Sequence, residues 1–350
     1  MSISVDAASC VYGGKYYTPG TDISSACTPT EVYLPAGPAQ DYRPQLFVYL
    51  VGTGGSPSDA HNILRTAAYA GYRSIGMSYD NIGSIASRCI AEGKPSCSDQ
   101  CGLRMRRVTI SGVNDPGLVW QIDPQDSIST RLVKALTALY DEDQWDNVSD
   151  FDWEDYIVVE QRQELNNTLW PGASATEAVL NWQNIVIAGF SQGAGHAVLI
   201  SMDRLVAGVA ALEGGNDRCV DPTGATAMAS YLTTRFNQSR NQPRFAARHA
   251  DNFMDGESGA PHHQPEWFPL HGFDITSHPV DLLPTPLTSN VVVTSQNVPS
   301  EAGCSEHKSV AVDQCMPTDA SLGDSSSASG LDADDAHLFA AYLEGLCSLD

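Results

Sequence analysis

The feature that most constrains the fold is an alternation of short apolar runs, each followed by glycines, with stretches of helical periodicity. Leu46-Phe47-Val48-Tyr49-Leu50-Val51 is followed directly by Gly52-Thr53-Gly54-Gly55, and a second run at 184–188 is also followed by glycine. Continuous apolar runs of this length are typical of strands buried on both faces of a parallel sheet. The alternation predicts one α/β domain over residues 1–350, with a doubly wound, mostly parallel sheet and helices on both faces.

The remaining elements are predicted from the same patterns. Strands are expected over residues 46–51, 72–79, 184–188, 206–212, 244–248 and 291–294, and helices over 58–70, 126–140, 153–169, 194–205 and 336–346. Ser58 is a candidate N-cap for the first of these helices. Loops are expected over residues 83–117, which contain three cysteines, and over residues 321–335. The segment 252–289 is rich in Pro and His and lacks periodicity, which indicates an active-site excursion or partial lid.

The charge balance excludes several classes of partner. The chain has 19 basic and 42 acidic residues, a formal net charge of −23. Such a surface repels phosphate backbones and anionic membranes, so we expect no nucleic-acid partner and a substrate that is not polyanionic. No stretch approaches 18 consecutive apolar residues, so no membrane span is predicted. We expect a monomer.

The nine cysteines predict disulfides rather than a metal site. Most lie in loop-like sequence and none has C-x-x-C spacing, which disfavours zinc and favours an oxidising compartment. We expect bridges Cys10–Cys27 and Cys304–Cys315 and one bridge within Cys89–Cys101, with at least one thiol left over. We therefore expect a secreted or periplasmic location. The first residues lack a signal-peptide pattern, so a secreted protein would already have lost its leader. A cytosolic protein with scattered thiols is the alternative.

Gly189-Phe190-Ser191-Gln192-Gly193 matches the pattern G-x-S-x-G between a predicted strand and a predicted helix of small residues. In this context the serine sits on a tight strand-to-helix turn, and glycines are needed because side chains there would collide with neighbouring backbone. The turn exposes the serine hydroxyl beside the helix N-terminus. The Gln192 N–H is then placed where a developing oxyanion would be stabilised.

On these residues, and on the order of its strands, the chain resembles the α/β-hydrolase superfamily. The stretch from Gly189 to Ala194 is also similar to the elbows of carboxylesterases, acyl-protein thioesterases and cutinases. The resemblance implies a doubly wound sheet and a Ser–acid–His triad in that chain order. It also implies an ester hydrolase that needs neither cofactor nor metal.

The resemblance assigns the other triad members by their position after strands. His307 follows the last predicted strand and matches the base that activates Ser191. Asp251 follows the preceding strand and matches the acid that orients the imidazole. Asp255 and Asp217 are the alternatives for the acid. Histidines at 262, 263, 271 and 278 lie in the excursion before the last strand, and those at 61, 196 and 337 on predicted helices are expected to be packing or surface residues.

Two further sets of residues complete the expected site. In this fold a second oxyanion donor comes from the loop after an early strand, where Thr53 and Gly54 offer their N–H groups. Trp267 and Phe268 are candidates for an apolar wall that contacts the substrate, or else for a cover over the sheet edge. The expected reaction is hydrolysis of an exposed ester, on a small molecule or a polymer such as plant material. The alternative is a catalytically inactive hydrolase fold used for binding.

Overall fold

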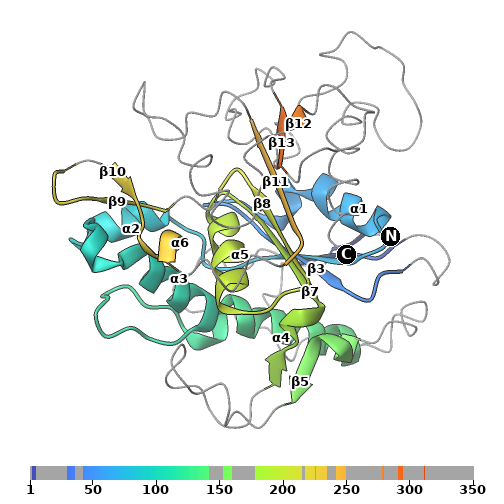
Figure 1. Ribbon diagram of the computed structural model, residues 1–350. Helices are drawn as coiled ribbons and strands as arrows, with labels where there is room; N and C mark the ends of the chain where they lie inside the picture. Colours follow the sequence, from blue (N-terminus) through green and yellow to red (C-terminus); the bar gives the residue numbers. More distant parts are fainter. Residues whose placement is uncertain are drawn as a thin grey trace.

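A nine-stranded sheet forms the centre of the described part of the chain in the computed structural model (Figure 1). The structure describes residues 2–4, 30–35, 42–141, 153–159, 178–214, 217–224, 226–234, 242–249, 278–279, 291–294 and 311. Across the sheet, the strands are β1 (Ser2–Ser4), β2 (Glu31–Tyr33), β4 (Arg73–Met77), β3 (Leu46–Leu50), β7 (Ile185–Phe190), β8 (Gly208–Leu212), β11 (Arg244–His249), β13 (Val291–Thr294) and β12 (His278–Pro279).

The sheet is mostly parallel. Only the β1–β2 and β2–β4 pairs of this sheet are antiparallel among the described strands, and the pairs from β4 across to β12 are parallel. Two antiparallel pairs lie outside it. They are formed by β5 (Ile157–Val159) with β6 (Ala178–Leu180) and by β9 (Arg218–Val220) with β10 (Thr226–Met228).

Helices cover both faces of the sheet. They are α1 (His61–Tyr69), α2 (Ile85–Ala91), α3 (Cys101–Ser111), α4 (Ile128–Asp141), α5 (Gln192–Asp203) and α6 (Tyr231–Thr234). The chain moves one way across the sheet from β3 to β4 and the other way from β7 to β8, so right-handed crossovers place α1 and α5 on opposite faces. Figure 1 shows α1 on one side of the strands and α3 and α5 on the other. The doubly wound, mostly parallel arrangement predicted from the sequence is confirmed.

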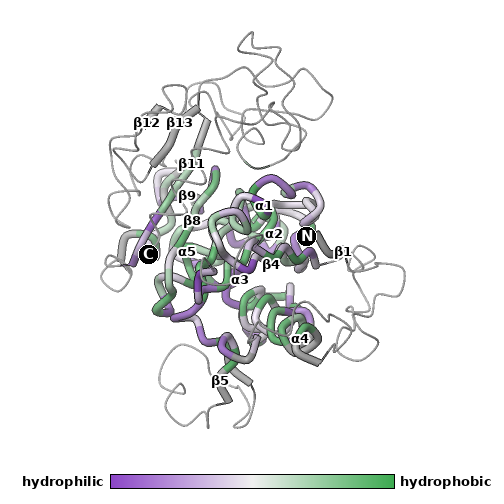
Figure 2. Tube along the Cα trace, turned by 90° about the vertical axis from the view of Figure 1, so that its right-hand side faces the viewer, coloured by the Kyte–Doolittle hydropathy of each residue, from purple (hydrophilic) through white to green (hydrophobic). Residues whose placement is uncertain are grey.

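The core is continuous through the central strands. Every residue of β3, β4, β7 and β8 is buried, as expected for strands covered on both faces. The tube in Figure 2 is largely hydrophobic along α4, whose residues Ile128, Leu132 and Leu136 repeat at helical spacing and are fully buried. No helix among the described residues is long and apolar enough to cross a membrane.

Two helices occupy the segment that the sequence predicted as a loop. Residues 83–117 contain α2 and α3 rather than a continuous loop, so this prediction is wrong. Ser84 caps α2 by accepting a hydrogen bond from the Ser87 N–H at 3.1 Å. The apolar stripe of α3 is formed by Cys101, Met105 and Val108, which are spaced for a helix but are interrupted by arginines that hide the pattern.

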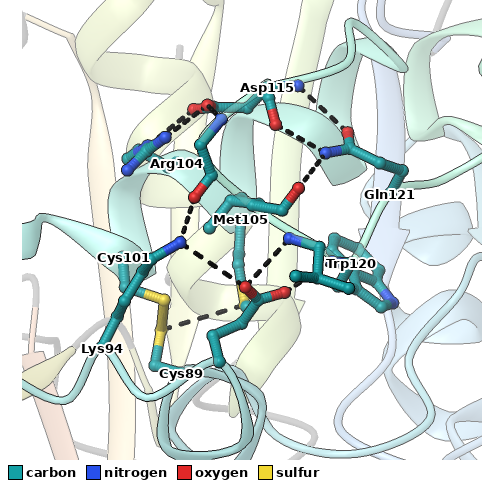
Figure 3. A network of polar contacts seen from close by, with 12 residues as sticks. Cys89, Lys94, Cys101, Arg104, Met105, Asp115, Trp120 and Gln121 are labelled. Atoms are coloured by element: carbon teal, nitrogen blue, oxygen red, sulfur yellow. Dashed lines mark hydrogen bonds and ion pairs between the residues drawn. A yellow bond between two sulfur atoms is a disulfide. The ribbon is translucent and has the colours of Figure 1, made fainter.

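The segment that carries α2 and α3 and continues to Ile122 is called the insertion here, and polar contacts hold its end in place (Figure 3). The Nε of Arg104 donates to Asp115 at 2.7 Å, and Gln121 both accepts from the Asp115 N–H at 3.0 Å and donates to the Asp115 carbonyl at 2.6 Å. Beneath them, the Cys89–Cys101 disulfide lies beside Met105, with 3.9 Å between the Cys89 and Met105 sulfurs. The insertion therefore has a small apolar core of its own, separate from that of the sheet.

Two smaller expectations are also corrected. The N-cap residue of α1 is Ala60, which makes no side-chain cap, so Ser58 is not the N-cap. Ser56 instead caps the short 3₁₀ turn at Pro57–Asp59, where it forms a capping box with Asp59. Residues 153–169 begin with a 3₁₀ turn (Trp153–Tyr156) and continue into β5, where Ile157-Val158-Val159 favours a strand. The predicted elements at 321–335 and 336–346 lie outside the described residues, as does most of the predicted excursion at 252–289.

Two disulfides join the described cysteines. Cys89–Cys101 confirms the bridge expected within that segment, and the second bridge, Cys97–Cys219, joins residues 122 positions apart. The sequence did not predict this second bridge, because spacing along the chain cannot reveal long-range pairs. The expected pairs Cys10–Cys27 and Cys304–Cys315 lie outside the described residues.

Removing the long-range bridge is expected to cost more stability than removing the local one. With loops of 122 and 12 residues, chain entropy predicts a loss of about 5 kcal/mol for Cys97→Ala/Cys219→Ala and about 3 kcal/mol for Cys89→Ala/Cys101→Ala. Urea unfolding of both double variants under oxidising conditions measures the two values. A larger loss for the local pair would contradict this ranking.

Candidate active site

The site lies where the sheet changes its winding direction. The chain leaves β3 toward α1 on one face and leaves β7 toward α5 on the other, and ligands in open α/β sheets bind at the carboxyl ends of strands that diverge in this way. Gly52-Thr53-Gly54-Gly55 follows β3 and Ser191 follows β7. The side chains of the two loops meet there, with Thr53 Oγ1 donating to Gln192 Oε1 at 2.9 Å.

Ser191 occupies a strained backbone conformation. It lies between β7 and α5 with φ 54° and ψ −114°, a region that residues with a Cβ rarely adopt and that costs about 1–3 kcal/mol. Its N–H donates to the Leu212 carbonyl of β8 at 2.9 Å, and its carbonyl accepts from the Gly195 N–H at 3.2 Å. The side chain is half-buried. The strained strand-to-helix turn predicted from the motif is confirmed.

The glycines around the turn are required by close backbone contacts. A Cβ on Gly189 would lie 2.3 Å from the Gly193 carbonyl carbon, and one on Gly193 would lie 2.0 Å from the Leu50 carbonyl oxygen. Real Cβ atoms do not approach this closely. Gly214, outside the motif, is equally constrained because its Cβ would lie 2.2 Å from the Ser191 carbonyl oxygen. The constraint on Gly214 had one signal in the sequence, which is the pair of glycines at 214 and 215 after the predicted strand at 206–212.

Two of the three predicted oxyanion donors have N–H groups without a partner among the described residues. These are Gln192, at the first position of α5, and Thr53. The Gly54 N–H donates to the Asn81 carbonyl at 3.0 Å, so it is already engaged. Thr53 is thus the better candidate in this loop. The hydrogen bond between the Thr53 and Gln192 side chains joins the two residues that carry these N–H groups.

Asn81 and Tyr79, which follow β4, shape the loop after β3. The buried Asn81 Nδ2 donates to the Gly52 carbonyl at 2.7 Å and to the Gly55 carbonyl at 2.8 Å, and the Tyr79 hydroxyl donates to the Val51 carbonyl at 2.6 Å. Burial raises the pKa of Tyr79, so its hydroxyl keeps its proton. These two positioning residues were not singled out from the sequence, because an Asn and a Tyr after a strand have no distinctive pattern.

Asp217, one of the three candidates for the triad acid, has another role in the structure. Arg106 of α3 binds both of its carboxylate oxygens, with the Arg106 Nε 2.6 Å from Asp217 Oδ2, and the Tyr231 hydroxyl donates to the same oxygen. Burial raises the pKa of Asp217, but the charge and hydrogen bonds of Arg106, with the Tyr231 hydrogen bond, outweigh burial and hold it below its ordinary value. Its oxygens are therefore already engaged.

His196 and Glu213 are buried titratable residues next to the turn. The His196 ring packs edge-on against Tyr79, with centroids 5.3 Å apart, and burial with repulsion from Arg106 and Arg88 holds its pKa well below its ordinary value. It is a neutral packing residue, as expected from its place on a helix. Glu213 follows β8 with φ 45° and is 2% exposed, so it is a carboxylate at the sheet edge that the sequence analysis missed.

The remaining predicted residues lie outside the described residues. These are His307, Asp251, Trp267 and Phe268, together with Asp255. The strands that precede the predicted acid and base are present as β11 and β13, and they are adjacent and parallel. Among the described residues, no group of three His, Cys, Asp or Glu side chains is arranged to hold a metal ion.

Comparisons with known proteins return solved structures only, since no family model and no curated protein matches the chain. Est1E from Butyrivibrio proteoclasticus is 11% identical with a TM-score of 0.29, covering 73% of this chain and 86% of its own. An α/β serine hydrolase homologue from Coxiella burnetii is 13% identical with a TM-score of 0.31, covering 83% and 92%. A mutant feruloyl esterase module from Clostridium thermocellum, complexed with sinapinate, is 15% identical with a TM-score of 0.34, covering 84% and 80%. At these values the likeness assigns neither a substrate nor a residue role to this chain.

A Cβ at residue 193 is expected to disrupt the turn. Gly193→Ala would force the added methyl group into the Leu50 carbonyl, and overpacking of this kind costs about 2–3 kcal/mol of unfolding free energy. Gly55→Ala is the matched control, because its Cβ would meet its nearest neighbour at 3.5 Å, an ordinary contact. Urea denaturation compares the two, and equal stabilities would contradict the close approach of α5 to β3.

Proposed function

We propose that this protein is a serine hydrolase that cleaves a carboxylic ester through an acyl-enzyme, with Ser191 as nucleophile, His307 as base and Asp251 as the orienting acid. The observation that carries the proposal is the strained Ser191 backbone, held between glycines at the carboxyl edge of the sheet. The N–H groups of Gln192 and Thr53, which have no partner within the part of the chain that the structure describes, support the same reaction, because acyl transfer needs donors that face the developing oxyanion.

Acylation uses the nucleophile, the base and the oxyanion donors together. The Ser191 Oγ attacks the ester carbonyl carbon while its proton passes to His307, and the carbonyl oxygen becomes an oxyanion held by the Gln192 and Thr53 N–H groups. When the tetrahedral intermediate collapses, the bond to the alcohol oxygen breaks and His307 returns the proton to the leaving alcohol. Asp251 orients the imidazole and stabilises its protonated form.

Deacylation repeats these steps with water. His307 takes a proton from the water as its oxygen attacks the acyl carbon, the same N–H groups hold the new oxyanion, and the Ser191 Oγ leaves with the proton from His307. The products are the free acid and the regenerated serine. No step needs a metal or a cofactor.

The serine itself argues against an inactive binding scaffold. At φ 54° and ψ −114° a glycine would adopt the backbone conformation without a steric penalty, whereas serine is strained there. A chain that used this turn only to join β7 to α5 would be more stable with glycine at residue 191. Compared with glycine, serine adds one reactive group, its hydroxyl.

The substrate that we propose is a neutral, exposed ester, on a small molecule or on a polymer. The net charge of −23 disfavours polyanions. Two disulfides support an oxidising compartment, so we propose a secreted or periplasmic enzyme that acts outside the cytosol.

Loss of the Ser191 hydroxyl is expected to abolish hydrolysis while leaving the fold intact. Ser191→Ala should lower kcat on a short-chain p-nitrophenyl ester by about 10⁴–10⁶-fold and should prevent labelling by a fluorophosphonate probe. Ser98→Ala, which changes an exposed serine on another element, is the control and should keep both properties. Full labelling of the Ser191→Ala variant, or a wild type that neither labels nor hydrolyses any ester, would refute the proposed function.

The assignment of base and acid is tested by four substitutions. His307→Ala is expected to be as inactive as Ser191→Ala, and Asp251→Asn to lower kcat by about 10³–10⁴-fold, because the imidazole would lose its orienting partner. Asp255→Asn and Glu213→Gln should retain far more activity. Steady-state kinetics on the same ester rank the variants, and a larger loss from either control than from Asp251→Asn would move the acid to that residue.

A further inference from the structure

A buried ion pair lies against the first turn of α5. Arg106 of α3 is 3% exposed, and its Nη1 donates to the Gln192 carbonyl at 2.8 Å. The other edge of the guanidinium binds Asp217 through Nε and Nη2. One side chain therefore joins the carbonyl of the residue after the nucleophile to a carboxylate 25 residues further along the chain.

Close packing fixes the guanidinium against the helix. A Cβ on Gly195 would lie 2.3 Å from the Arg106 Cζ, so this glycine permits the guanidinium to approach the backbone of α5. Flat contact with the first turn, together with the hydrogen bond to the Gln192 carbonyl, restricts rotation of the Gln192–Gly193 peptide. The neighbouring Gln192 N–H belongs to the same residue and is the predicted oxyanion donor.

Asp217 is itself held from three directions. Its carbonyl accepts from the Ala229 N–H at 2.9 Å, its carboxylate accepts from the Tyr231 hydroxyl, and the Cys97–Cys219 disulfide ties the chain two residues further on. Arg106 is thus anchored to a point that cannot easily move away from α5. The arrangement of charges also favours a negative oxyanion next to Gln192, because the positive guanidinium contacts Gln192 and the Asp217 carboxylate binds the opposite edge of that guanidinium.

Stability alone does not account for this arrangement. A buried ion pair can often be replaced by apolar side chains at no cost in stability, because removing two charges from water offsets their attraction. What an apolar replacement cannot supply is a hydrogen bond to the Gln192 carbonyl. The oxyanion site needs such preorganisation, since a donor that must reorient during the reaction loses much of its effect.

We infer that Arg106 is a positioning residue for acyl transfer, which holds the Gln192 carbonyl and thereby fixes the first turn of α5 so that the Gln192 N–H, one peptide before it, faces the oxyanion, with Asp217 as its anchor. The inference rests on the proposed function, because it assumes that Ser191 forms a tetrahedral intermediate beside Gln192. It assigns to α3 a part in catalysis that neither the serine motif nor the triad order contains.

The test compares Arg106→Met with Arg131→Met. Arg131 of α4 forms a buried ion pair with Asp126, which precedes that helix, at 2.8 Å. It is therefore a matched control for the loss of a buried charge pair. Arg106→Met should lower kcat on a short-chain p-nitrophenyl ester by about 10²-fold, the effect of a lost oxyanion donor, and change KM by less than about threefold. Arg131→Met should lose stability with kcat unchanged per folded molecule.

Binding of phenylboronic acid separates positioning from general damage. The Ser191 Oγ adds to boron as its proton passes to His307, giving a tetrahedral adduct with an oxygen in the oxyanion position. Its affinity for the Arg106→Met variant should fall by the same factor as kcat. Arg106→Lys should recover part of both, since one ammonium group can reach the Gln192 carbonyl or Asp217 but cannot reproduce the fork.

Asp217→Asn keeps the inference testable if Arg106→Met does not fold. It leaves Arg106 with its bond to Gln192 but weakens the anchor, so kcat should fall by about tenfold with KM nearly constant. An active wild type whose folded Arg106 and Asp217 variants keep full kcat and boronate affinity would overturn the positioning role and leave the proposed function standing. A wild type that neither hydrolyses esters nor labels at Ser191 would overturn both.

Discussion

Backbone contacts that leave no room for a Cβ hold the centre of this structure together. The first turn of α5 lies directly on the end of β3, and the segment after β8 lies directly on Ser191. Glycines at 189, 193 and 214 permit these approaches, and each would be blocked by any other residue. Because the elements are so close, the turn between β7 and α5 can hold a serine in a conformation that serine does not favour. The same closeness brings the Thr53 loop alongside Gln192.

Support for this turn comes from parts of the chain outside the sheet. The insertion of α2 and α3 supplies Arg106, and the segment around β9 supplies Asp217. A disulfide fastens the two segments to each other. The central strands thus set the position of the nucleophile, while the peripheral elements restrain the peptide next to it. Asn81 has a similar role on the other side, where it shapes the loop that carries Thr53.

The features that the sequence predicted correctly are those with a local physical cause. Most central strands appear as short apolar runs and the serine turn appears as two glycines at fixed spacing, so β3, β4, β7, β8, β11, β13 and the turn at Ser191 could be predicted. The short strands β1, β2 and β12 were not predicted, because two or three residues carry no periodicity. α3 could not, because its arginines interrupt the apolar stripe, although Arg106 is itself buried. The Cys97–Cys219 bridge and the Arg106–Asp217 pair join distant residues, and no local pattern records such pairs. The assignments of His307 and Asp251 stay predictions.

The long-range disulfide has a consequence for how the chain reaches its native state. During synthesis, Cys89, Cys97 and Cys101 all become available well before Cys219, and any two of them can be oxidised together. Pairing of α2 with α3 favours the native outcome because it brings Cys89 to Cys101 and leaves Cys97 for Cys219, and a wrong bridge among the three must be exchanged before Cys97 can pair. A bridge from Cys97 to a neighbour would leave Cys219 without its partner, and Asp217, two residues before Cys219, would lose the covalent link that ties its segment to the one that carries Arg106.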